Sequence, residues 1–229
     1  LKNWAKYKLE HGVTAFLSTT ASVTLTRLKN AVRDIRNVIN EDSETLNLLG
    51  LHLEGPFFKK GKKIGAQNPD YIMNKYSQYF REFLSKNRDL LFYLALDPEN
   101  AAAGEVIRDC HKLDIKVAAG HSEILYQDFC NLKQKYNSIT HTFNGMVGLH
   151  HRQPGLAYAA CMEEDLFAEI ICDGFHVIYP MLELFFKLRG YDKSILITDS
   201  MLATGMPPGT RYTLGDLAVT VNKEGKFCK

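Results

Sequence analysis

LHLEGPFF, at positions 51–58, contains the end of a run of apolar residues and gives the first indication of the fold. Residues 46–53 form a nearly unbroken apolar stretch, which is typical of a strand buried on both faces of a parallel sheet. Glu54 ends this stretch, and Gly55 and Pro56 are residue types that end strands and open loops. The sequence therefore predicts a carboxylate at the C-terminal tip of a buried strand, where ligands bind in α/β folds. An ordinary glutamate that reaches solvent is the alternative at this point.

The composition is that of an ordinary protein domain. The chain has 229 residues, of which 45% are hydrophobic and 24% charged, enough for one large domain. A net charge of +2 gives no indication of a nucleic-acid partner. The five cysteines are scattered and never form a CxxC pair, which predicts reduced thiols and a cytoplasmic protein. No apolar run approaches the roughly 18 residues of a membrane span, so no membrane partner is expected.

Apolar periodicity predicts strands that alternate with helices. Strands are predicted at residues 13–17, 46–53, 90–96, 115–120, 138–143, 166–172 and 194–199, and helices at residues 3–11, 24–40, 70–88, 99–113, 123–136, 156–163 and 177–189. This alternation predicts the α/β class, with a parallel sheet and right-handed crossovers. Seven such units favour a (β/α)8 TIM-like barrel, whose first strand would precede residue 1. A doubly wound open sheet is the alternative, but the chain has no GxGxxG or GxxxxGK[ST] phosphate loop.

The last residues depart from this pattern. Residues 213–221 alternate in polarity, and residues 222–225 are typical of a turn, which predicts an antiparallel hairpin. We therefore expect two domains, a partial barrel at 1–205 and the start of a β domain at 206–229. Because the sequence begins at Leu1 and stops at Lys229 just after a strand-like segment, we expect both ends to be truncated.

Four polar side chains are predicted at strand tips that open onto one face of the barrel: Glu54, His121, His141 and Asp199. One carboxylate and two histidines, with a water as fourth ligand, are typical of a catalytic zinc site. The metal would lower the pKa of that water, and Asp199 would accept its proton. Taken singly, a strand-end histidine is more often structural and an aspartate can cap a helix. Their coincidence on separate strands favours a metal-dependent hydrolase.

Seven motifs in series carry a family resemblance. LHLEGPF is followed by GAQNP at 65–69, AGHS at 119–122, THTFNGM at 140–146, RQPG at 152–155, DGFHV at 173–177 and TDSMLATG at 198–205. Each motif alone is weak, but their order and spacing resemble the N-acetylglucosamine-6-phosphate deacetylase family of the amidohydrolase superfamily. The resemblance covers the chain from about residue 10 to its end.

The resemblance implies hydrolysis of the acetamide of N-acetyl-D-glucosamine 6-phosphate to D-glucosamine 6-phosphate and acetate, in amino-sugar catabolism. It assigns one divalent metal ion to Glu54, His121 and His141, with zinc, iron, manganese and cobalt as candidates and a second ion left open. It assigns the acid/base role to Asp199. The substrate, a small sugar phosphate, would be held by Gln67, Asn144, Gly145, Arg152 and His176. A homodimer and a β-sandwich domain beside the barrel are also implied.

One position departs from the family pattern. The GAQNP motif often carries a histidine where this chain has Gln67. That histidine is thought to polarise the acetamide carbonyl, and a glutamine can still donate a hydrogen bond but cannot titrate.

Two alternatives to this function stay open from the sequence. Another amidohydrolase, such as a deaminase or a cyclic-amide hydrolase, would share the metal and the aspartate but would not need Arg152 or His176. A non-catalytic sugar-phosphate binding protein would have no use for a base beside a metal, so the complete Glu54, His121, His141 and Asp199 set argues against it.

Overall fold

The structure is a computed structural model that describes residues 1–41, 47–214, 217–222 and 227–228. Seven strands form one parallel sheet whose spatial order, β1-β2-β3-β4-β5-β6-β7, follows the chain. The strands are β1 (Phe16–Thr20), β2 (Leu48–Glu54), β3 (Leu91–Leu96), β4 (Lys116–Ala119), β5 (Ser138–Ile139), β6 (Phe167–Ile171) and β7 (Ser194–Ile197). The α-helices are α1 (Lys2–Glu10), α2 (Leu25–Glu41), α3 (Gln78–Lys86), α4 (Ala103–Lys112), α5 (Tyr126–Cys130), α6 (Leu156–Met162) and α7 (Tyr179–Arg189).

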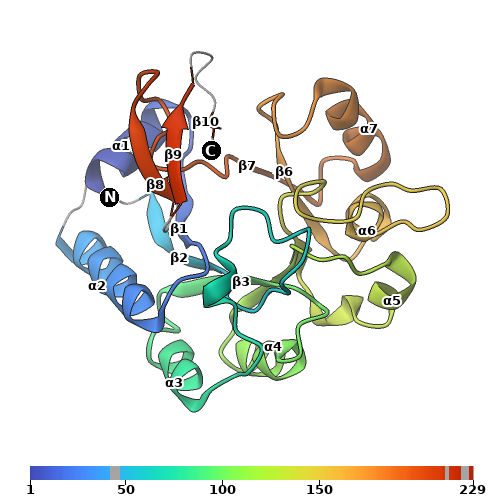
Figure 1. Ribbon diagram of the computed structural model, residues 1–229, viewed down its shortest axis with the longest axis horizontal. Helices are drawn as coiled ribbons and strands as arrows, with labels where there is room; N and C mark the ends of the chain where they lie inside the picture. Colours follow the sequence, from blue (N-terminus) through green and yellow to red (C-terminus); the bar gives the residue numbers. More distant parts are fainter. Residues whose placement is uncertain (42–46, 215–216, 223–226, 229) are drawn as a thin grey trace.

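The sheet curls, and α2 to α7 lie around its outside (Figure 1). A doubly wound sheet would reverse its strand order at a switch point, whereas here the order runs from β1 to β7 without reversal. The architecture therefore fits a (β/α)8 TIM-like barrel, as predicted, with seven of the strands in this chain. Because all seven strands are parallel, their C-terminal tips lie on one face of the sheet.

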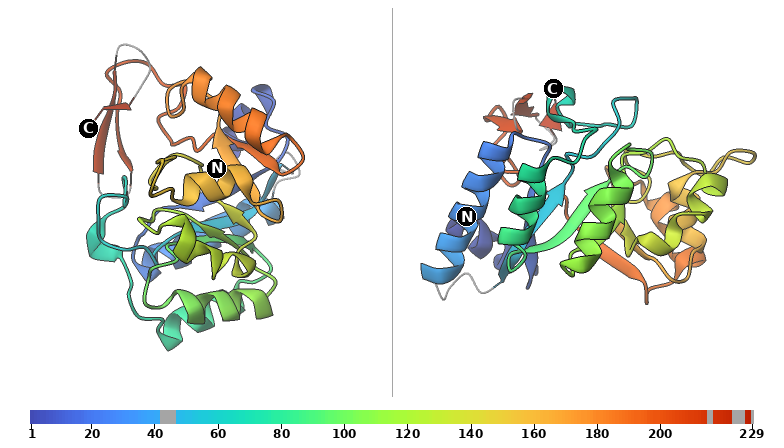
Figure 2. Two further views of the ribbon diagram at one scale, coloured as in Figure 1. Left: turned by 90° about the vertical axis from the view of Figure 1, so that its right-hand side faces the viewer. Right: turned by 90° about the horizontal axis from the view of Figure 1, so that it is seen from below.

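The core lies between the sheet and the helices around it. Strand residues Leu51, Leu53 and Leu94 are at most 1% exposed, as expected for strands covered on both faces. Helix α2 presents apolar residues three or four positions apart, and Leu28 and Ile35 from that stripe are buried against the sheet. Figure 2 shows the helices packed along the outside of the sheet. None of the described helices has the length and apolarity needed to cross a membrane.

Several predicted boundaries were wrong. The first strand is residues 16–20, not 13–17, because the polar residues 18–20 pair with residues 51–53 of β2 instead of forming a loop. The strand predicted at 138–143 ends at Ile139, and the one predicted at 194–199 ends at Ile197. Left-handed backbone angles at residues 141, 143 and 199 explain both early ends, since they are incompatible with an extended strand.

Two predicted helices are also shorter in the structure. The helix predicted at 70–88 is confined to α3, and a 3-10 turn (η2, Pro69–Tyr71) precedes it. Ser77 caps α3, because its hydroxyl accepts the backbone N–H of Phe80. The helix predicted at 123–136 is α5 followed by a second 3-10 turn (η3, Lys133–Lys135).

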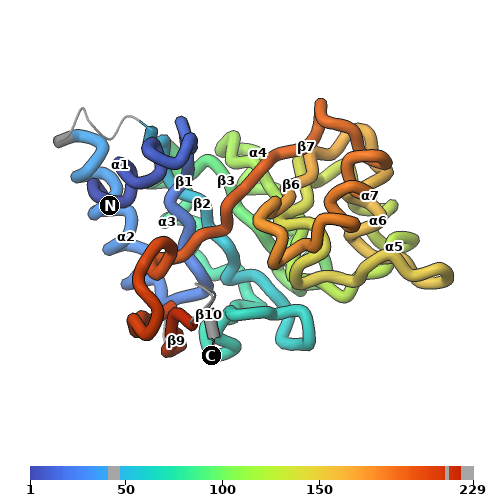
Figure 3. The backbone as a smooth tube through the Cα atoms, turned by 90° about the horizontal axis from the view of Figure 1, so that it is seen from above, coloured from blue at the N-terminus to red at the C-terminus, as the bar shows by residue number. Residues whose placement is uncertain are grey.

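A small antiparallel sheet follows the parallel one. Its strands are β8 (Arg211–Leu214), β9 (Leu217–Val221) and β10 (Phe227–Cys228), in the order β10-β9-β8. The alternating stretch at 213–221 contains two strands, β8 and β9, which pair antiparallel, and β10 pairs antiparallel with β9. The predicted turn at 222–225 falls mostly outside the described residues. After β7 the chain crosses back past β1 to reach this small sheet (Figure 3).

Candidate metal centre

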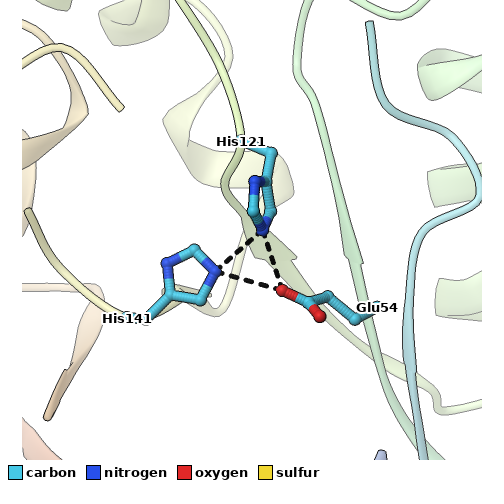
Figure 4. Close-up of side chains that lie close together, drawn as sticks. All are labelled: Glu54, His121 and His141. Atoms are coloured by element: carbon cyan, nitrogen blue, oxygen red, sulfur yellow. Dashed lines mark hydrogen bonds and ion pairs between the residues drawn. The ribbon is translucent and has the colours of Figure 1, made fainter. Parts of the chain in front are cut away.

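Glu54, His121 and His141 converge at the C-terminal face of the parallel sheet (Figure 4). Oε1 of Glu54 lies 2.8 Å from Nε2 of His121 and 3.1 Å from Nε2 of His141. The two Nε2 atoms lie 3.0 Å apart. Glu54 is the last residue of β2, and the histidines follow β4 and β5. Three potential ligand atoms from three strand tips therefore surround one point.

The backbone at both histidines is unusual for residues other than glycine. His121 has a φ of 49° and His141 a φ of 27°, both in the left-handed region. Such angles are energetically unfavourable and persist only where the surrounding structure enforces them. They turn each chain segment sharply at the end of its strand, so that the side chain points across the face of the sheet. The sequence gives no signal for these angles.

Hydrogen bonding orients the His121 ring. Its Nδ1 lies 2.8 Å from the backbone oxygen of Lys63, which can only accept, so Nδ1 carries a proton and donates it. Nε2 then faces the Glu54 carboxylate. Because both atoms are acceptors, a proton on Nε2 or a cation between the two atoms is required for a favourable contact. A metal-ligating histidine commonly donates its other ring N–H to a backbone carbonyl in this way.

The electrostatics of the centre favour a positive charge. Burial alone would raise the pKa of Glu54, but hydrogen bonds from His121 and His141 outweigh it and hold the pKa well below its usual value. Burial opposes the charged form of His141, but the hydrogen bond to Glu54 raises its pKa to about 9. Ligand atoms that share one tetrahedral zinc at about 2.0–2.1 Å lie roughly 3.3 Å apart. The triad therefore fits a divalent ion after small outward movements of the side chains.

Gln67 lies directly against the triad and is only 6% exposed. Its Nε2 donates to Oε2 of Glu54 across 2.9 Å, and its Oε1 accepts the backbone N–H of Ser22 across 2.6 Å. Gln67 was predicted to bind substrate. In this structure both ends of its amide contact protein groups, and one of them is the carboxylate of a candidate ligand.

Asp199 follows β7 with a φ of 45°. Its side chain is exposed to solvent, and the charged groups Glu54, His141 and His176 act on it. The loss of solvation raises its pKa above the usual value, and the negative charge of Glu54 raises it further, while His141 and His176 oppose the shift. A carboxylate whose pKa is changed by the charges of the neighbouring triad is suited to accept and release a proton.

The remaining predicted residues surround this centre less tightly. Gly145 has a φ of 57°, and a Cβ added there would lie 2.7 Å from Nδ1 of His121, so only glycine fits. Asn144 follows His141, whose backbone oxygen accepts its backbone N–H at 2.9 Å. Arg152 is exposed in the loop before α6. His176 is exposed too, and its Nδ1 lies 2.6 Å from Oδ2 of Asp173.

Sequence reasoning missed two groups that support the centre. One is the backbone oxygen of Lys63, whose place in a lysine-rich loop gives no sign of its contact with His121. The other is Glu169, a buried carboxylate in the middle of β6. A charged residue in the predicted strand at 166–172 is the signal that would have indicated it, because such residues are rarely buried without a specific partner.

Comparisons with known proteins find several relatives of similar sequence. A protein named N-acetylglucosamine-6-phosphate deacetylase from Vibrio furnissii is 33% identical over 97% of this chain and 55% of its own length. One of the same name from Bacillus subtilis is 34% identical over 93% of this chain and 54% of its own length. An N-acetylgalactosamine-6-phosphate deacetylase from Escherichia coli O157:H7 is 32% identical over 93% of this chain and 56% of its own length. The chain thus spans about half the length of the curated relatives it matches. No family model matches the chain.

Solved structures give the same result for the fold. The crystal structure of N-acetylglucosamine-6-phosphate deacetylase from Thermotoga maritima matches with a TM-score of 0.86 and 35% identity, over 96% of this chain and 59% of that one. A structure of the enzyme from Mycobacterium smegmatis, a D267A mutant in complex with N-acetyl-D-glucosamine-6-phosphate, matches with a TM-score of 0.81 and 26% identity, over 92% of this chain and 54% of that one.

Proposed function

This chain is a homologue of the N-acetylglucosamine-6-phosphate deacetylases over nearly its whole length, and we propose that it carries the catalytic face of such an enzyme. The proposed reaction adds water to the acetamide of N-acetyl-D-glucosamine 6-phosphate. The water oxygen bonds to the acetyl carbon, the C–N bond breaks, and a proton passes to the sugar nitrogen. The products are D-glucosamine 6-phosphate and acetate. The observation that carries the proposal is the convergence of Glu54, His121 and His141 on one point.

In this proposal the triad holds one divalent ion, and zinc, iron, manganese and cobalt are the candidates. Such an ion, when bound, supplies Lewis acidity toward a water or a carbonyl oxygen. Asp199 takes a proton from the attacking water and returns it to the leaving nitrogen, a role supported by its raised pKa beside Glu54. Gln67 holds Glu54 in place and keeps an amide hydrogen available toward the substrate.

The substrate's anionic end is assigned to side-chain donors. The chain has no glycine-rich phosphate loop, so we assign the phosphate to Arg152 and His176. A guanidinium can donate to two phosphate oxygens at once. Nδ1 of His176 donates to Oδ2 of Asp173, and this contact orients the ring whose Nε2 we assign to the sugar phosphate. Asn144 and the backbone of Gly145 are assigned to the same substrate.

Three further assignments belong to this proposal. The small sheet of β8, β9 and β10 opens a β-sandwich domain from residue 206 onward. The enzyme acts as a homodimer. It acts in the cytoplasm, where free thiols are stable, because Cys110, Cys130, Cys161 and Cys172 are unpaired in the part of the chain that the structure describes.

The test is acetate release from N-acetyl-D-glucosamine 6-phosphate. We expect release that stops after treatment with a chelator and returns when a divalent metal is added back. N-acetyl-D-galactosamine 6-phosphate is the comparison substrate, because a relative named for it is about as similar as the others. Metal binding without acetate release from either sugar would favour another amidohydrolase. Sugar-phosphate binding without turnover would favour a binding protein.

A further inference from the structure

Glu169 is a buried carboxylate that the proposed chemistry does not use. It lies in the middle of β6 and is 6% exposed. Its neighbours Ala168, Ile170 and Ile171 are also buried and are apolar. A carboxylate in such a position is unfavourable unless hydrogen bonds compensate for its lost hydration. The contacts of Glu169 therefore indicate what it does.

Those contacts reach the segment that carries His141. Oε2 of Glu169 accepts the hydroxyl of Thr140 at 2.7 Å and the backbone N–H of His141 at 3.3 Å. The backbone oxygen of Glu169 accepts the N–H of Thr142 at 2.7 Å. One residue of β6 thus holds three consecutive residues that follow β5. These residues are themselves buried, with exposed fractions of 2%, 4% and 0%.

This segment needs such support. Strand β5 is only two residues long, and His141 leaves it with a φ of 27°. A left-handed residue other than glycine persists only where its surroundings enforce it. The Glu169 carboxylate accepts the N–H of that same residue and fixes the side chain before it. The direction in which His141 Nε2 points, toward Glu54 and His121, is therefore set partly from β6.

The geometry argues against a direct role for Glu169 in metal binding or catalysis. The three atoms that could ligate an ion belong to Glu54, His121 and His141. Glu169 contacts the backbone of His141, not its ring. Its Oε2 is already occupied by two donors from the 140–141 segment.

We propose that Glu169 is a positioning residue for His141, which holds residues 140–142 in the conformation that completes the metal triad. The inference rests on the proposed function only in that the triad binds a divalent ion, and it does not depend on the substrate. Supporting groups of this kind commonly change metal affinity by about 10- to 100-fold when removed.

The experiment is a titration of metal-free protein with Zn²⁺ in competition with a fluorescent zinc chelator. Glu169→Met removes the acceptor at similar length, and we expect zinc affinity to fall by about 10- to 100-fold. Glu169→Gln keeps an acceptor oxygen and should restore affinity to within about 5-fold of the wild type. Thr140→Val keeps the shape of its side chain but removes one donor, and should weaken binding by about 3- to 10-fold. Far-UV circular dichroism checks the fold of each variant.

Glu163 offers a matched control. It is another buried glutamate, 8% exposed, that binds the hydroxyl of Tyr126 at 2.6 Å and Nζ of Lys133 at 2.5 Å. Glu163→Met should lower thermal stability and leave zinc affinity unchanged.

Wild-type zinc affinity in a folded Glu169→Met protein would overturn the inference, as would an equal loss in Glu169→Gln. If Glu169→Met does not fold, Thr140→Val decides, because unchanged affinity in that variant contradicts the positioning role. A wild-type protein that binds no zinc or other divalent ion would overturn the proposed function and this inference together. Zinc binding without acetate release would count against the proposed function alone.

Discussion

Gln67 donates a hydrogen bond to the Glu54 carboxylate oxygen that neither His121 nor His141 contacts. The amide nitrogen of Gln67 donates to Oε2 across 2.9 Å, while Oε1 faces His121 and His141. The other end of the amide accepts the N–H of Ser22 across 2.6 Å. Gln67 thereby joins the segment after β1 to the tip of β2. The residue that was predicted to bind substrate therefore also supports a candidate metal ligand directly.

Replacing Gln67 with leucine should therefore weaken metal binding. The change keeps the side chain similar in size but makes it apolar, so Oε2 of Glu54 and the N–H of Ser22 lose this partner. We expect zinc affinity to fall by about 10-fold, measured by chelator competition. Gln78→Leu, at an exposed position on α3, is the control and should bind zinc as the wild type does. Equal affinity in both variants would show that Glu54 needs no support from Gln67.

Replacing Glu54 with alanine should remove most of the bound metal. A site with three protein ligands loses much of its affinity when one is absent. Metal content per folded chain, measured by inductively coupled plasma mass spectrometry after dialysis, is the readout. The same loss is expected for His121→Ala and His141→Ala. One metal ion per chain in a folded Glu54→Ala protein would contradict the assignment.

Replacing Asp199 with asparagine should abolish turnover without loss of metal. The amide is similar in size to the carboxylate but cannot accept the proton of the attacking water. General acid–base catalysis contributes about 10²- to 10⁴-fold to rate, so kcat should fall by that factor while metal content stays the same. A loss of less than about tenfold would show that Asp199 is not the base.

Replacing Arg152 with alanine should affect the phosphorylated sugar selectively. A charge-assisted contact contributes about 1.5 to 3 kcal/mol, so kcat/KM for N-acetylglucosamine 6-phosphate should fall by about 10- to 150-fold. Slow hydrolysis of unphosphorylated N-acetylglucosamine should barely change, because that substrate lacks the phosphate. Arg33→Ala, at an exposed position paired with Asp34 on α2, is the control. Equal losses on both sugars would mean that Arg152 supports the fold or the metal centre instead.

Replacing Asp97 with asparagine should change the pH dependence of stability. Asp97 is 1% exposed at the end of β3, and burial raises its pKa from 3.8 to about 6. The folded protein therefore holds a proton that the unfolded chain releases between these pH values. The contribution of protonated Asp97 to the free energy of unfolding is fully present below about pH 4 and is lost as the pH rises through about 6.

Asparagine does not titrate, so the Asp97→Asn variant should not lose stability as the pH rises through about 6. Its Oδ1 can still accept the N–H of Glu99, as Asp97 does at 2.9 Å. At pH 7.5 we expect the free energy of unfolding to rise by about 1 to 3 kcal/mol, and near pH 4 little change is expected. Urea unfolding at both pH values is the measurement. An equal effect at both would show that Asp97 does not titrate in this range.

The sequence predicted the barrel and the convergence of the triad for clear physical reasons. Strand periodicity and β/α alternation place Glu54, His121 and His141 at tips of parallel strands, and such tips necessarily share one face. The ends of β5 and β7 could not be predicted in the same way. They depend on left-handed backbone angles that long-range contacts enforce, and those contacts are not local in sequence. The supporting roles of Gln67 and Glu169 were missed for the same reason, because Gln67 bonds to Ser22 and Glu169 bonds to Thr140, and both partners are distant in the sequence.

The left-handed angles at His121, His141 and Asp199 have a consequence for laboratory evolution. Each such residue costs about 1 to 3 kcal/mol of stability, and glycine adopts these angles without that cost. A selection that rewards thermal resistance alone would therefore favour glycine at the three positions that the proposed chemistry most needs. Directed evolution of this chain for thermal stability should be coupled to a screen for metal retention. Without that screen, the selected variants would be more stable but would no longer bind metal.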